Sequence, residues 1–416
     1  MRKLAYIIIG IIFATFTLVS CKDDSIDLEE LTEQTILVYM PWSGSATSDG
    51  LTYYLKQNLD SIEQAIIDQK GLQQNKLFVM FSTSANAASL YEVKYSNNKI
   101  VHNLIKDYSG TDVNTSEAIT DIWNTVIANA DNSLNYAAMI IGSHAVGWTY
   151  KEDWKNYPYY SKQHTNVTDN QESEENYPKT RFFGSVSDIA NYGIDIETLA
   201  EGIANSNIPS TPGKKLQYIL FDGCYMANVE SAYALRNVTN YLVASTSEIM
   251  EAGMPYHSMW SSISSKTPNY SSMTSTYTSF YKKQTYPYGT LSAINCNNLD
   301  ELAGVMKDIN NGNYAVIDSL KDSIQVLDGF NTPIFYDMKS YVTSLNINSR
   351  LTSRFSVAYN KVVASTSATE RIYSLLYGSP VIRKLKHYSG MTLSDYSKNE
   401  VVLRGREKTE WWKATH

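Results

Sequence analysis

Residues 216–224 read Leu-Gln-Tyr-Ile-Leu-Phe-Asp-Gly-Cys. The near-continuous hydrophobic run is typical of a strand that is buried on both faces of a parallel sheet. It ends in Asp222, Gly223 and Cys224, so an acid and a thiol directly follow the strand. In open parallel sheets, ligands bind in the crevice beyond the carboxyl ends of the strands. The stretch therefore predicts a parallel sheet with a reactive cysteine at its functional edge.

A second strand end carries a histidine, because residues 137–144 read Ala-Ala-Met-Ile-Ile-Gly-Ser-His. A single histidine in a turn, or a single cysteine after a strand, is more often structural than catalytic. Two such residues at equivalent strand ends favour catalysis, with Cys224 as the nucleophile and His144 as the general acid and base. We expect a helix to begin at Tyr225. The dipole of this helix and the nearby imidazole would both lower the pKa of the thiol.

Strands and helices alternate through the first part of the chain. Hydrophobic runs predict strands at 36–40, 77–81, 137–141, 216–221 and 241–244. Between them, apolar residues recur every three or four positions, as in 51–66 and 119–126, which is typical of amphipathic helices. This alternation predicts an α/β fold with a mostly parallel sheet, right-handed crossovers and helices on both faces. We assign this domain to residues 35–262 and expect a helical and mixed C-terminal extension over 263–416.

The composition fits a globular protein. The 416 residues are 43% hydrophobic and 19% charged, which excludes a fibre, a disordered tail and a multi-span membrane protein. The formal net charge is −7, whereas nucleic-acid-binding proteins carry a basic footprint. We therefore expect no nucleic-acid partner.

The N-terminus has the pattern of a lipoprotein signal. Two basic residues precede an uncharged apolar run over 4–19, as in a secretory signal peptide. The sequence Leu-Val-Ser-Cys at 18–21 resembles the bacterial lipobox, whose cysteine carries the lipid. We predict a signal peptide over 1–20, lipidation of Cys21 and an acidic tether over 21–34, which would anchor the protein in the cell envelope, at the outer membrane or the cell surface. An ordinary cleaved signal peptide with an incidental cysteine is the alternative.

Two cysteines remain if Cys21 carries lipid. Cys224 and Cys296 could form one disulfide in an oxidising compartment, or Cys224 could stay free as a nucleophile. Cys296 lies in an Asn-rich stretch without other reactive side chains, and we interpret it as structural.

These motifs resemble the clostripain family of cysteine peptidases, in the clan of caspases, legumains and gingipains. The family pattern of an aliphatic strand followed by Phe-Asp-Ala-Cys is matched at 221–224, and its Leu-Val-Ala-Ser and Gly-x-Pro-Tyr segments at 242–245 and 253–256. Other matches are Met226, Glu230 and the segments 36–40, 193–196, 388–393 and 411–414. The resemblance covers most of residues 35–416. It implies a caspase-like fold and a secreted cysteine endopeptidase that acts on peptides or proteins.

The resemblance also implies roles for single residues. Cys224 would attack the scissile carbonyl, and the backbone N–H groups of Cys224 and Ala145 would stabilise the oxyanion. Asp222 would line the S1 pocket and select arginine or lysine; the alternative is that it only caps a helix. The sequence contains no zinc-binding or phosphate-binding motif, so we expect no metal and no cofactor. Calcium is suggested only by family analogy, because the acidic cluster at 169–175 lacks the spacing of a calcium loop.

Two positions depart from the family pattern. The usual His-Gly is His144-Ala145 here, and Asp-Ala-Cys has become Asp-Gly-Cys at 222–224. Glycine at position 145 would allow a positive φ, which alanine resists; the change leaves open whether activity is lower, and both side chains of the dyad remain. Together with a surface expected to be rich in tyrosine, since the chain has 32 Tyr, the change favours an alternative function, a catalytically silent surface lipoprotein that binds peptide or glycan.

A polar segment over 149–180 separates the histidine and cysteine strands. Some members of the family mature by cutting themselves in this interval, and an exposed polar loop can reach a protease cleft without unfolding the core. The segment carries several lysines and is followed by Arg181, which matches the preference expected from Asp222. We predict self-cleavage after Lys179, Arg181 or another lysine of the loop. The alternative is that the segment is a substrate-binding flap.

Overall fold

The computed structural model describes residues 34–44, 50–130, 136–157, 177–182, 186–208, 215–376 and 380–416. The predicted signal peptide, Cys21, nearly all of the tether and the acidic cluster at 169–175 lie outside these residues. Within the described ranges, no helix is both long enough and apolar enough to cross a membrane.

Among the described residues, nine strands form one sheet in the order β10-β8-β7-β6-β5-β1-β2-β3-β4. Its centre is parallel, since β1 pairs with β2 and β5, β5 with β6, and β6 with β7. These strands are β1 (Gln34–Met40), β2 (Asn75–Ser84), β5 (Tyr136–Gly142), β6 (Ile219–Asp222) and β7 (Tyr241–Ala244). The predicted α/β fold is confirmed. Strand β6 begins later than the hydrophobic run suggested, because Leu216 makes only an isolated bridge to Thr239.

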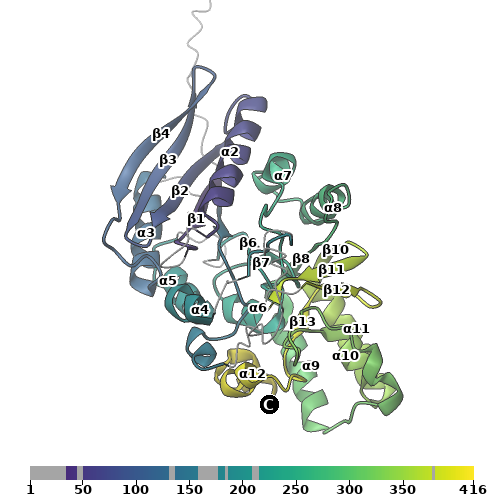
Figure 1. Ribbon diagram of the computed structural model, residues 1–416. Helices are drawn as coiled ribbons and strands as arrows, with labels where there is room; N and C mark the ends of the chain where they lie inside the picture. The colour runs from purple at the N-terminus through teal and green to yellow at the C-terminus, as the bar shows by residue number, and fades with distance from the viewer. Residues whose placement is uncertain are drawn as a thin grey trace, which may run out of the picture. The chain divides into compact units, whose positions relative to one another are not determined.

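Antiparallel strands that the sequence patterns missed extend both ends of this sheet (Figure 1). The hairpin of β3 (Ala87–Ser96) and β4 (Lys99–Asp107) continues it from β2. At the other end, β8 (Thr290–Asn295) pairs with β7, and β10 (Val363–Ala368) pairs with β8. The part of the chain after residue 262 therefore contributes two strands to the same sheet as the first part.

Helices cover both faces of the sheet, because its central strands alternate between two apolar clusters. On β1, Leu37 and Tyr39 pack into a cluster with Trp123 of α3, whereas Ile36 and Val38 pack into another with α2. Helix α7 packs against α2, and α5 packs against α3 and α6. The longer helices are α2 (Thr52–Asp68), α3 (Ser116–Asn129), α5 (Ile196–Ala204), α7 (Tyr256–Ile263), α8 (Tyr270–Tyr281), α9 (Leu299–Asn311) and α11 (Ser349–Val362).

Shorter elements complete the described chain. The short helices are α4 (Val186–Tyr192), α6 (Val229–Leu235), α10 (Met338–Ser344), α12 (Glu400–Gly405) and α13 (Glu410–Thr415), with 3₁₀ turns η1 (Lys151–Trp154), η3 (Cys296–Asn298), η4 (Asp318–Ser323) and η6 (Arg406–Lys408). Two small antiparallel pairs join β11 (Arg371–Ser374) to β12 (Val381–Lys384) and β13 (Thr392–Leu393) to β9 (Tyr336–Asp337).

The helix expected at Tyr225 begins at Val229 instead. Tyr225 has φ +63°, in the left-handed region, which a helix cannot contain. The helix is capped by Asn228, whose side chain accepts a hydrogen bond of 2.7 Å from the backbone N–H of Ser231. Cys224 is therefore separated from the helix by a turn, and the predicted stabilisation of a thiolate by the helix N-terminus is wrong.

Candidate active site

The two strand ends singled out in the sequence are neighbours in the sheet. Strands β5 and β6 pair in register, with Gly142 opposite Asp222. His144 and Cys224 each lie two residues beyond this pair, and the backbone N–H of Ser143 donates to the carbonyl of Asp222 at 3.3 Å. The structure thus brings His144, Asp222 and Cys224 to one edge of the sheet, as the strand-end rule predicted.

A segment of the chain itself occupies this edge. Residues 179–181 run antiparallel to residues 249–251: the N–H of Arg181 donates to the carbonyl of Ile249 at 2.8 Å, and that of Glu251 to the carbonyl of Lys179 at 3.0 Å. Thr180 and Met250 form the bridge between them. Added-strand pairing of this kind is a common way for a domain to bind an extended peptide.

The carbonyl of Arg181 lies at the N–H group that was expected to stabilise an oxyanion. The backbone N–H of Ala145 donates to the Arg181 carbonyl at 3.3 Å. The ring of His144 also hydrogen-bonds the backbone of Arg181. The peptide bond between Arg181 and Phe182 therefore begins at the N–H group that the sequence predicted for the oxyanion.

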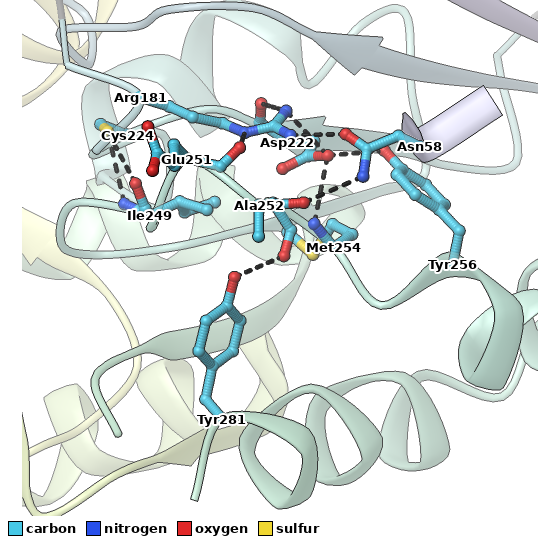
Figure 2. Close-up of polar contacts among 11 residues, drawn as sticks. Asn58, Arg181, Asp222, Cys224, Ile249, Glu251, Ala252, Met254, Tyr256 and Tyr281 are labelled. Atoms are coloured by element: carbon cyan, nitrogen blue, oxygen red, sulfur yellow. Dashed lines mark hydrogen bonds and ion pairs between the residues drawn. The ribbon is translucent and has the colours of Figure 1, made fainter. Parts of the chain in front are cut away.

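The side chain of Arg181 is fully buried against Asp222 (Figure 2). Its Nη1 lies 2.9 Å from Oδ2 of Asp222 and donates to the Asp222 carbonyl at 3.1 Å. Its Nε donates to the carbonyl of Glu251 at 3.2 Å, and its Nη2 donates to Oδ1 of Asn58 on helix α2. A guanidinium presents donors in a fixed fork, and here each of its three nitrogens has an acceptor.

Asp222 is held by the Gly-x-Pro-Tyr segment noted in the sequence. Its Oδ2 accepts hydrogen bonds from the N–H of Met254 at 3.2 Å and from the hydroxyl of Tyr256 at 2.9 Å. Burial raises the pKa of the Asp222 carboxyl, and the charge of Arg181 opposes this rise. Because Asn228 caps the helix that follows, capping does not explain Asp222.

Gly253 provides the space for the guanidinium. It has φ +73°, and a Cβ atom there would lie 2.0 Å from Nη2 of Arg181. The carbonyl of Gly253 accepts a hydrogen bond of 2.6 Å from the hydroxyl of Tyr281 on α8, which fixes this wall of the pocket (Figure 2). Neither Asn58 nor Tyr281 was found by sequence reasoning, because each is a polar residue within a helix with no motif around it.

The pKa values of the Cys224 thiol and the His144 imidazole are both shifted in the direction that favours the neutral form. Burial, followed by the Glu248 carboxylate, raises the pKa of the Cys224 thiol. Loss of solvation lowers the pKa of His144 to about 4. The expectation of a lowered thiol pKa is therefore wrong, because the thiol is buried and the helix begins only at Val229. The sulfur of Cys224 accepts a hydrogen bond of 3.3 Å from the N–H of Ile249.

The other chemical expectations concern cysteine pairing and metals. Cys224 and Cys296 are both free and buried, so the disulfide alternative is wrong. Within the described ranges, no group of three or more His, Cys, Asp or Glu residues could hold a metal ion.

Comparison with known proteins places these features in a family. A family model described as the clostripain family matches residues 193–408, a range that contains Asp222, Cys224 and Gly253. A solved structure of a secreted C11 cysteine protease from Bacteroides thetaiotaomicron, "iotapain", is 36% identical with a TM-score of 0.78, covering 92% of this chain and 99% of that chain. The chain belongs to the clostripain family. It is accordingly a cysteine endopeptidase with a caspase-like fold.

Two further solved structures are similar to this clostripain-family chain. A clostripain from Bacteroides thetaiotaomicron in complex with the peptide inhibitor BTN-VLTK-AOMK is 40% identical with a TM-score of 0.50, covering 55% of this chain and 96% of that one. An inactive zymogen C11 protease from Parabacteroides distasonis is 20% identical with a TM-score of 0.73, covering 93% and 99%, and shows the shared fold. A comparison with curated proteins gave no match.

The two departures from the clostripain pattern lie against each other. A Cβ atom on Gly223 would lie 3.0 Å from Cβ of Ala145 and 3.1 Å from the carbonyl oxygen of Ser143. The backbone of Ala145 lies outside the left-handed region, so alanine is not strained there. A methyl group at position 223 would thus crowd the one present at position 145, and we infer that the two departures compensate for each other.

A double-mutant cycle tests whether positions 145 and 223 compensate for each other. Gly223→Ala should lower both the melting temperature and peptide turnover, because overpacking costs about 1–3 kcal/mol. Adding Ala145→Gly, which removes the crowding methyl group, should recover part of the loss, because the contact of 3.1 Å with the Ser143 carbonyl oxygen remains. Thermal unfolding and a fluorogenic peptide assay on the four proteins measure the coupling.

A matched control is Gly304→Ala in helix α9, where a Cβ atom would meet nothing within 4 Å. It should leave the melting temperature unchanged or raise it slightly, because alanine favours helix. The compensation is refuted if Gly223→Ala alone is as stable and as active as the wild type.

Proposed function

We propose that this clostripain-family protein is a lipid-anchored endopeptidase that uses Cys224 and His144, cuts after arginine in preference to lysine, and is made as a self-inhibited precursor. One observation carries the proposal. Arg181 of the same chain has its backbone paired with residues 249–251, its carbonyl at the Ala145 N–H and its side chain at Asp222. This is the arrangement expected of a bound substrate.

The chemistry follows from these positions. The Cys224 thiol gives its proton to His144, and its sulfur attacks the carbonyl carbon, forming a C–S bond as the carbonyl oxygen becomes an oxyanion. The N–H groups of Ala145 and Cys224 stabilise that charge. His144 then protonates the amine as the C–N bond breaks. In the second half, His144 takes a proton from water, the hydroxide displaces the sulfur, and the proton returns to the thiolate.

The geometry of the S1 pocket supports arginine over lysine. The guanidinium donates from three nitrogens to Asp222, Asn58 and the Glu251 carbonyl. A lysine ammonium at the same site keeps the attraction to Asp222 but cannot reach all of these acceptors at once. The inhibitor of the Bacteroides thetaiotaomicron clostripain carries lysine last in VLTK, which supports a basic residue at this position in the present chain.

Peptides that differ only at this residue test the preference. Pro-Lys-Thr-Arg with a fluorogenic amide should be cut with a kcat/KM about tenfold higher than Pro-Lys-Thr-Lys, since each lost hydrogen bond costs about 1 kcal/mol. Asn58→Ala should reduce the ratio of kcat/KM for the arginine peptide to that for the lysine peptide, because it removes an acceptor that a guanidinium reaches and an ammonium does not. Asp222→Asn should reduce cleavage of both peptides. Equal cleavage of peptides with a neutral residue at this position would contradict the proposed specificity.

The bound segment also supports self-inhibition. Arg181 fills the pocket that a substrate arginine would need, and the thiol and imidazole beside it are shifted toward neutrality. Cutting the Arg181–Phe182 bond would free the segment to leave. Strands β5 and β6 would then belong to different fragments of one sheet, so we expect the fragments to stay associated.

Incubation of the purified chain should therefore give two fragments, with Phe182 as the new N-terminus by mass spectrometry. Cys224→Ala and His144→Ala should each remain a single chain. Lys179→Ala is a matched control and should still be cut, because Lys179 contributes its backbone to the pairing, whereas Arg181→Ala should lose this cut. Equal nicking of wild type and Cys224→Ala would assign the cut to a contaminating protease.

Lipid anchoring is proposed from the lipobox at 18–21. The mature chain should begin at Cys21 and partition into detergent, because two or three acyl chains give stable membrane attachment. Cys21→Ser should partition into the aqueous phase. An unmodified N-terminus at another residue by intact-mass measurement would rule out the anchor.

The silent-binder alternative was favoured by Ala145 and by the many tyrosines. The N–H of Ala145 reaches the Arg181 carbonyl, and the alanine methyl lies where a methyl group at position 223 would crowd it. Because the chain belongs to a family of cysteine endopeptidases, we keep catalysis, and not silent binding, as the proposed function.

A further inference from the structure

The residue before Arg181 also lies in a defined site. Thr180 is buried, with 8% of its surface exposed. Its hydroxyl donates a short hydrogen bond to Oε2 of Glu248 and accepts one from the N–H of Phe182 at 3.4 Å. Because the Phe182 N–H can only donate, the single hydroxyl proton of Thr180 points to the Glu248 carboxylate.

Glu248 is held in place by parts of the chain that lie far apart in sequence. Its Oε1 accepts hydrogen bonds from the hydroxyl of Tyr225 at 2.8 Å and from the hydroxyl of Ser374. Its Oε2 accepts one from the N–H of Leu375 at 3.1 Å. The side chain of Glu248 is almost completely buried. A carboxylate fixed by three permanent donors and offered a fourth by the bound segment has the properties of a recognition site.

We propose that Glu248 forms a subsite that selects threonine or serine directly before the scissile arginine. The inference rests on the proposed function, because it takes residues 180 and 181 as the last two residues on the N-terminal side of a cleaved bond. Substrate binding strips water from the Glu248 oxygen. A hydroxyl side chain replaces that water with a hydrogen bond, whereas an apolar side chain of the same shape leaves the oxygen without it.

Valine is the sharpest competitor, because it has nearly the shape of threonine but no hydroxyl. Burial raises the pKa of Glu248, and the hydrogen bonds that it accepts oppose this rise. A hydrogen bond to its carboxylate form predicts that threonine is preferred by roughly tenfold to a hundredfold in kcat/KM. Since Oε2 keeps the Leu375 N–H in either case, we expect the lower half of this range. Serine should retain most of the advantage over alanine for the same reason.

The first experiment uses the purified enzyme and four fluorogenic peptides. They are Pro-Lys-X-Arg amides with threonine, valine, serine or alanine at X, and the threonine peptide repeats residues 178–181 of the chain. The expected order of kcat/KM is threonine and serine well above valine and alanine. Equal cleavage of the threonine and valine peptides would overturn the subsite and leave the proposed arginine-specific peptidase intact.

The second experiment changes Glu248 itself. Glu248→Gln should reduce the threonine-to-valine ratio several-fold, because a neutral amide makes a weaker bond to the hydroxyl than a carboxylate does. Its arginine-to-lysine ratio should stay unchanged, since Asp222 and Asn58 are untouched. The matched control is Glu230→Gln, another buried glutamate, which accepts the Ser394 N–H and has no described contact with residues 179–182. This control should keep the wild-type threonine-to-valine ratio.

The chain's own segment gives an independent readout that needs no change to Glu248. Thr180→Val should slow self-cleavage after Arg181 by a factor similar to the threonine-to-valine ratio of kcat/KM for the peptides. Thr180→Ser should cleave itself at close to the wild-type rate. Identical rates for the valine and serine variants would overturn the subsite. Failure of the enzyme to cut any of the four peptides or itself would instead overturn the proposed function, and the subsite with it.

Discussion

The buried ion pair between Arg181 and Asp222 is the interaction on which the described site depends. Two charges removed from water are stable only when their remaining donors and acceptors are also satisfied. Here Asn58 and the Glu251 carbonyl complete the guanidinium. Met254 and Tyr256 both donate to Oδ2 of Asp222, the oxygen that also faces Arg181, whereas Oδ1 has no hydrogen-bond partner among the described residues. The pair thereby ties helix α2, strand β6 and the segment after β7 to one point. Each nitrogen of the Arg181 guanidinium thus has an acceptor in this pocket, which is the basis of the proposed preference for arginine.

Hydrophobic runs were sufficient to predict the centre of the sheet. The strands around Leu37, Met139 and Leu220 are buried on both faces, so their sequences read as unbroken apolar stretches. Strand β4 could not be found in this way because it lies at the sheet edge and is largely exposed; Leu104, for example, is 64% exposed. Strand β4 is held in the sheet by its pairing with β3, so its own hydrophobic pattern does not reveal it.

Candidate site residues that follow buried strands could be predicted from the sequence, whereas those held by distant contacts were missed. His144, Asp222 and Cys224 follow buried strands, so local sequence places them at the sheet edge. Asn58 and Glu248 act through contacts with residues more than sixty positions away, and nothing in their own neighbourhoods marks them. The pKa of the thiol was predicted in the wrong direction for a related reason. Burial decides it, and burial depends on which segment covers the site.

Glu248 explains why the last third of the chain belongs to the site. Ser374 and the Leu375 N–H fix one side of its carboxylate, and Tyr225 fixes the other. Tyr225 directly follows Cys224, and its left-handed φ of +63° is sterically costly for a residue with a side chain. Stacking on Phe335 at 4.7 Å and the bond to Glu248 hold it there. The backbone that presents the thiol is thus stabilised by residues more than a hundred positions downstream, so the parts before and after residue 262 cannot be separated without loosening the proposed nucleophile.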